Sequence, residues 1–81
     1  MNLFYNVGKG ATEDPRCIVV NYKGNPDSDE VDVALVGKGL TFDTGGLNLK
    51  PTGFIEDMFG DKGGACAVLG AMYGTLELGL K

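Results

Sequence analysis

The chain has 81 residues, 43% of them apolar, which is enough to bury one small core at most. Its formal net charge is −4, with 7 basic and 11 acidic residues, and this balance argues against binding of nucleic acid or of an anionic membrane, both of which need clustered lysine and arginine. It has no histidine and two distant cysteines, so a thiolate zinc site is excluded. No segment resembles a signal peptide or a membrane-spanning helix, and the predicted location is cytoplasmic.

Three short apolar runs predict three β-strands. The first, residues 3–7, is aromatic and apolar and ends at a glycine. The second, residues 17–22, is rich in β-branched side chains that suit a buried strand, and the third spans residues 31–36. Because the connecting loops are too short for helical crossovers, we expect the strands to pair as a hairpin or meander.

A glycine-rich loop and one helix follow these strands. Residues 37–60 are predicted to form a long loop, and a loop of that length inside a compact domain is usually functional. Residues 62–78 have apolar side chains at helical spacing and predict one helix with a buried face. Asp61 is the predicted N-cap, and Gly79 the predicted stop. The apolar positions are Ala65, Val68, Leu69, Met72, Tyr73 and Leu76.

Two carboxylates and two lysines lie on this loop or at its end. Asp43 and Asp61 offer hard oxygen donors for zinc, manganese or magnesium, and they are the first candidate ligand pair. Lys38 follows a predicted strand, where α/β sheets place ligand sites, and its amine binds a metal only after losing a proton. Lys50, if protonated, can stabilise negative charge on a substrate carbonyl as water attacks. Together these residues predict a metal-dependent hydrolytic site.

Each of these residues also has an ordinary structural interpretation. Asp43 precedes a threonine and two glycines and can form an Asx-turn. Asp61 can cap the following helix, and a carboxylate has enough lone pairs to cap a helix and bind a metal. Lys38 and Lys50 can be solvated surface lysines. Only the joint arrangement favours a site.

Residues 36–46 carry a more specific pattern, because they read VGKGLTFDTGG. This stretch closely resembles the signature of the leucine aminopeptidase (cytosol aminopeptidase) family of dinuclear metallopeptidases, and Lys50 and Asp61 follow it at matching intervals. The likeness runs nearly end to end. It implies an α/β fold: a fragment of a mixed-sheet metallopeptidase catalytic domain with about three strands, a metal-binding loop and one helix. Residues 1–81 would then be a partial catalytic domain, truncated at both ends.

The resemblance also implies a role for each matching position. Lys38, Asp43 and Asp61 correspond to ligands of one of two divalent metal ions, manganese or zinc, and Asp43 is expected to bridge to the second ion. Lys50 corresponds to the catalytic lysine, and Met58 to a residue that lines the pocket for the substrate's N-terminal side chain. The implied reaction is the hydrolytic removal of leucine-like N-terminal amino acids from peptides. The implied assembly of the complete protein is a homo-hexamer.

Three departures from the family pattern limit these expectations. The family's second signature, Asn-Thr-Asp-Ala-Glu-Gly-Arg, supplies two further carboxylate ligands and an arginine, and this sequence does not contain it. Phe59 stands where a basic residue is common. Lys62 replaces an apolar residue directly after Asp61, and its charge is expected to weaken metal binding. We therefore expect the isolated chain to be inactive. The alternatives are an inactive truncated homologue that acts as an interaction module, and a fragment produced by gene prediction.

Overall fold

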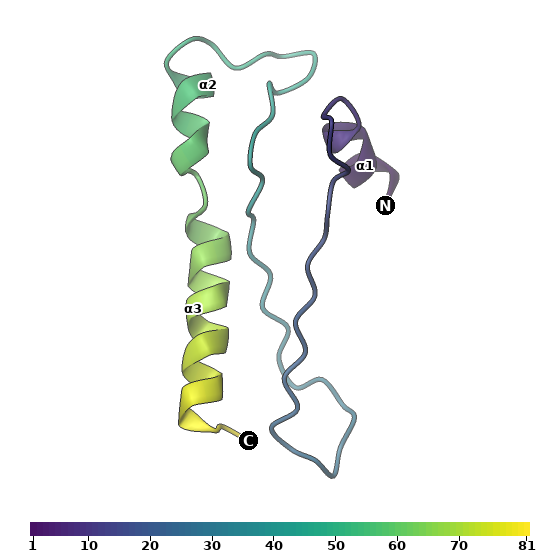
Figure 1. Cartoon of the computed structure of the whole chain (residues 1–81), viewed down its shortest axis with the longest axis vertical. Coiled ribbons are helices and arrows are strands. Elements are labelled where there is room, and N and C mark those ends of the chain that lie inside the picture. Colours follow the sequence, from purple (N-terminus) through teal and green to yellow (C-terminus); the bar gives the residue numbers. More distant parts are fainter.

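The fold, described for all 81 residues by a computed structural model, consists of helices joined by extended chain (Figure 1). Helix α1 spans Asn2–Gly8, α2 spans Phe54–Asp57, the 3-10 turn η1 spans Met58–Gly60, and α3 spans Gly63–Leu78. In Figure 1, α2 lies beyond the N-terminal end of α3, and long irregular segments separate both from α1. None of these helices is both long enough and apolar enough to cross a bilayer.

The predicted three-stranded sheet is wrong, because the structure contains no β-strand. Residues 3–7 belong to the helix α1 instead. The Tyr5 N–H donates to the Met1 carbonyl at 3.1 Å, and the Lys9 N–H donates to the Tyr5 carbonyl at 2.9 Å. A helix pairs its backbone groups within one segment, whereas a strand needs a second segment, so this short run pairs its groups locally.

Residues 17–22 and 31–36 are extended, as Figure 1 shows, but they do not form a ladder. No backbone hydrogen bond joins one segment to the other. Their β-branched side chains face solvent, with Ile18 83% and Val36 95% exposed. Extended chain becomes a strand only beside a hydrogen-bonded neighbour. The α/β fold class is therefore corrected to a helical and irregular chain, in which the expected strand pairing is absent.

The predicted helix over residues 62–78 is confirmed as α3. Gly79 ends it in the left-handed conformation, at φ 58°, as predicted. The predicted N-cap is wrong, because Lys62 occupies that position and no side chain caps the helix. Only part of the predicted apolar face is covered. The half-buried positions are Ala65, Val68 and Met72, and the exposed ones are Leu69, Tyr73 and Leu76.

The first turn of α3 packs directly against residues 37–39. A Cβ added to Gly37 would lie only 2.4 Å from the Gly64 carbonyl oxygen, so the two backbones meet where neither residue has a side chain. The Ala65 N–H donates to the Lys38 carbonyl at 3.0 Å. This contact fixes Lys38 beside the start of α3.

The predicted loop over residues 37–60 is irregular at first but ends in α2 and η1. Met58, in η1, is the only buried residue of the chain, at 5% exposure. The radius of gyration is 16.4 Å, whereas a compact chain of this length has about 12 Å. The chain therefore lacks a central core, and its tightest packing surrounds Met58.

Candidate functional site

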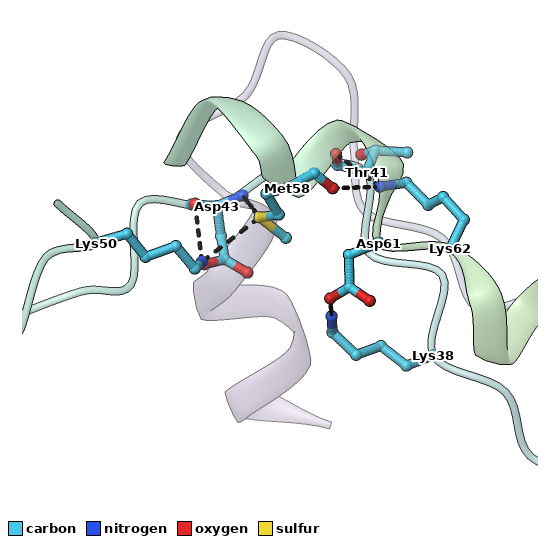
Figure 2. Close-up of polar contacts among 7 residues, drawn as sticks. All are labelled: Lys38, Thr41, Asp43, Lys50, Met58, Asp61 and Lys62. Atoms are coloured by element: carbon cyan, nitrogen blue, oxygen red, sulfur yellow. Dashed lines mark hydrogen bonds and ion pairs between the residues drawn. The ribbon is translucent and has the colours of Figure 1, made fainter. Parts of the chain in front are cut away.

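All five residues singled out from the sequence lie in one region, between the loop after Lys38 and the turn η1 (Figure 2). They form two ion pairs, one between Lys38 and Asp61 and one between Lys50 and Asp43. Met58 contacts the second pair. The two carboxylates thus face two different lysines.

The Lys38–Asp61 pair links the loop to η1. The Lys38 Nζ donates to the Asp61 Oδ2, and both side chains are more than half exposed. The Asp61 N–H donates to the Met58 carbonyl at 3.0 Å, which holds Asp61 at the end of η1. The hydrogen bond from Lys38 is the main reason that the pKa of Asp61 lies below its ordinary value, and the charges of Lys38, Lys62 and Lys50 lower it further. Asp61 is therefore anionic at neutral pH.

The Lys50–Asp43 pair is less exposed, with 30% and 21% of the two side chains accessible. The Lys50 Nζ donates to the Asp43 Oδ1 and also to the Asp43 carbonyl, at 3.0 Å. The hydrogen bond from Lys50 lowers the pKa of Asp43 below its ordinary value, against partial burial, which raises it. The charge of Lys38 also lowers this pKa, so the two ion pairs lie within electrostatic range of each other.

A tight turn brings Lys50 back over Asp43. The Lys50 N–H donates to the Thr44 carbonyl at 2.9 Å, and Gly45 and Gly46 have φ values of 98° and 80°, a region that favours glycine. The Gly45 N–H also contributes to the lowered pKa of Asp43.

Met58 closes the region from the side of η1. Its Sδ accepts the Asp43 N–H at 3.2 Å and lies 3.5 Å from the Lys50 Nζ. A cavity of about 460 Å³ opens beside it. The lining residues are Lys50, Pro51, Phe54, Asp57, Met58 and Asp61. One residue of each ion pair, Lys50 or Asp61, therefore borders a concave surface with one apolar wall.

The donor set fits part of a divalent cation site. Lys38 offers an amine, and Asp43 and Asp61 offer carboxylates, whose lowered pKa values extend their ionised form to more acidic pH. No three histidine, cysteine, aspartate or glutamate side chains gather at one point. Since a zinc site takes four ligands, these three donors would need others to complete it.

Lys62 makes contacts that the sequence does not indicate. Its Nζ donates to the Thr41 carbonyl at 3.2 Å and to the Met58 carbonyl at 3.0 Å (Figure 2). From the sequence, the positive charge of Lys62 indicates only that this residue would repel a nearby cation. Backbone carbonyls occur at every residue, so no sequence pattern identifies which of them a lysine meets.

Residues 1–81 match the sequence profile of the cytosol aminopeptidase family, catalytic domain. A probable cytosol aminopeptidase of Treponema denticola is 47% identical over 81 residues, which are all of this chain and 17% of that protein. Those of Pseudomonas fluorescens (strain Pf0-1) and Aquifex aeolicus are 49% and 51% identical over 99% and 96% of this chain, in each case 16% of the relative. The chain thus spans about one sixth of the length of these relatives. No solved structure gives a significant match. Because the family profile covers every residue, the chain belongs to the cytosol aminopeptidase family.

Proposed function

We propose that this chain carries part of the active site of a metal-dependent aminopeptidase that removes leucine-like N-terminal amino acids from peptides. One observation supports the proposal: in a chain of this family, Lys50 and Asp61 line one cavity, and each forms an ion pair with a further candidate residue, Asp43 and Lys38 respectively. The complete protein would act on peptides in the cytoplasm as a homo-hexamer.

Two divalent ions, manganese or zinc, belong to this proposal. Lys38, Asp43 and Asp61 would hold one of them, and Asp43 would also contact the second. When bound, such ions supply Lewis-acid activation of a water molecule. Lys38 would bind as a neutral amine, so binding of metal releases its proton. Asp43 and Asp61 are already ionised at neutral pH, and they offer anionic donors without a proton loss.

Lys50 is the proposed catalytic residue of this chain. Lys50 lines the cavity, and two oxygens of Asp43 orient its ammonium group. A fixed positive charge at this place stabilises the negative charge that develops on the scissile carbonyl oxygen. Met58 and Phe54 give the same cavity an apolar wall, which suits an aliphatic N-terminal side chain.

A chimera tests this proposal. In this chimera, residues 1–81 replace the segment of the Treponema denticola relative that aligns with them. We expect the chimera to bind manganese and hydrolyse a leucyl chromogenic substrate. Lys50→Met should lower kcat by about 10²–10³, the loss typical of one charge-stabilising donor, with the metal content unchanged.

Lys23→Met is the matched control, since Lys23 is exposed and pairs with Asp29 outside the site. It should leave kcat unchanged. A folded, metal-loaded chimera without activity contradicts the proposal, and so does a Lys50→Met chimera with full activity.

A second candidate function is an interaction module without catalysis. This function is favoured by residues 17–22 and 31–36, which have exposed apolar side chains and unpaired backbone groups. Such extended segments add readily to the edge of a β-sheet in a partner protein. Co-purification of the chain with a full-length family member, abolished by Val19→Lys or Val33→Lys, supports this function. If the chain never associates with such a member, the second candidate is discarded.

A further inference from the structure

Lys62 connects the two segments that carry the carboxylates. Its first acceptor, the Thr41 carbonyl, lies two residues before Asp43, and its second, the Met58 carbonyl, lies three residues before Asp61. Figure 2 shows the ammonium group next to both carbonyls, while the Asp61 carboxylate faces Lys38. Lys62 is itself half-buried at the start of α3.

Few other contacts hold these segments together. Besides Lys62, the Lys38–Asp61 ion pair and the Asp43 N–H on the Met58 Sδ link them directly. That ion pair is more than half exposed, which weakens it, and sulfur is a weak acceptor. Only Met58 is buried, so apolar packing contributes little. Hydrogen bonds from a charged donor are stronger than neutral ones, and Lys62 makes two of them, from a less exposed side chain than that of Lys38, so they form a strong polar tie between loop and turn.

We infer that Lys62 is a positioning residue, whose ammonium group ties the loop bearing Asp43 to the turn bearing Asp61 and so presets the spacing of two carboxylates for one cation. This inference rests on the proposed function. The inference predicts that removal of Lys62 weakens metal binding, whereas charge repulsion alone predicts that it strengthens metal binding. Salt screens the repulsion, but loss of the two hydrogen bonds leaves both donor segments free to move apart.

The test is manganese binding to the purified chain, measured by isothermal titration calorimetry at pH 7 and physiological ionic strength. Lys62→Met removes both hydrogen bonds and the charge, and it should weaken binding about tenfold, the lower end of the loss seen when a group that orients metal ligands is removed. Lys62→Arg keeps donors and charge and should restore most of the affinity. Lys23→Met, the same change at an exposed lysine outside the site, should have no effect.

Equal or tighter manganese binding by Lys62→Met overturns the inference, because the lysine then acts by repulsion alone. Lys62→Gln, which keeps one donor group without charge, is included in case Lys62→Met loses the circular dichroism of α3. Binding by Lys62→Gln weaker than by Lys62→Arg supports the inference, and equal or tighter binding overturns it.

A metal-free measurement separates this inference from the proposed function. In the wild-type chain, the Met58 methyl group and the Asp43 amide should give a nuclear Overhauser effect, which Lys62→Met should remove. If the effect persists, Lys62 does not position the loop, whatever the metal affinity. If the wild-type chain binds no manganese, or if Asp61→Asn leaves binding intact, the cation site itself is refuted.

Discussion

Substitution of Gly37 by alanine tests the contact that places Lys38 in the site. The added methyl group would lie 2.4 Å from the Gly64 oxygen, 2.7 Å from the Gly64 carbonyl carbon and 2.8 Å from the Val68 Cγ2, whereas ordinary contact begins at 3.4 Å. The Gly64 atoms are backbone and cannot rotate away. Residues 37–39 and α3 must therefore separate by about 1 Å, the difference between 3.4 and 2.4 Å.

Two terms give the size of the effect. Crowding of a packed contact costs about 1–3 kcal/mol. The 3.0 Å hydrogen bond from Ala65 to Lys38 is stretched or lost, which costs about 1 kcal/mol more. We expect Gly37→Ala to lower the free energy of unfolding by about 2–4 kcal/mol. Lys38 also moves away from Asp61, so the pKa of Asp61 should rise towards its ordinary value.

Urea unfolding followed by the far-ultraviolet circular dichroism of α3 measures this loss, and a carboxyl NMR titration measures the pKa of Asp61. Gly60→Ala is the control, since a Cβ at Gly60 meets no atom within 4 Å and its φ is not positive. Gly37→Ala should have a much lower urea midpoint than Gly60→Ala. If the two variants unfold at the same midpoint, the close approach of residues 37–39 to α3 is not what holds this part of the chain.

Three further outcomes are expected. The lowered pKa values of Asp43 and Asp61 stabilise the folded chain fully above about pH 4, and this contribution is lost as the pH falls through the folded-state pKa values. Carboxyl NMR titration midpoints that are no lower in the folded chain than in denaturing urea would contradict this. Met58→Ala removes the only buried side chain and should cost about 2 kcal/mol of unfolding free energy, more than Met72→Ala at a half-buried position, as measured by urea unfolding. The isolated chain with manganese or zinc should not hydrolyse a leucyl chromogenic substrate, because three donors do not complete a dinuclear centre, and turnover at an ordinary enzymatic rate would refute this.

Local sequence predicted the parts of this protein that depend on neighbouring residues. The apolar period over residues 62–78 predicted α3, and Gly79 predicted its end, since both depend on backbone geometry within one segment. The stretch of residues 36–46 indicated the family, which the match over the whole chain confirms. The roles assigned to Lys38, Asp43, Lys50, Met58 and Asp61 remain predictions.

Tertiary structure decided what depends on residues far apart in the chain. Residues 17–22 and 31–36 have the composition of strands, but a strand exists only when a second segment accepts its hydrogen bonds, and none does so here. In the same way, local sequence does not specify that Asp61 pairs with Lys38 instead of capping α3, or that Lys62 binds two carbonyls. Such partners are fixed only when the backbones of the loop and α3 meet at Gly37 and Gly64, because that approach sets which charged groups come within bonding distance.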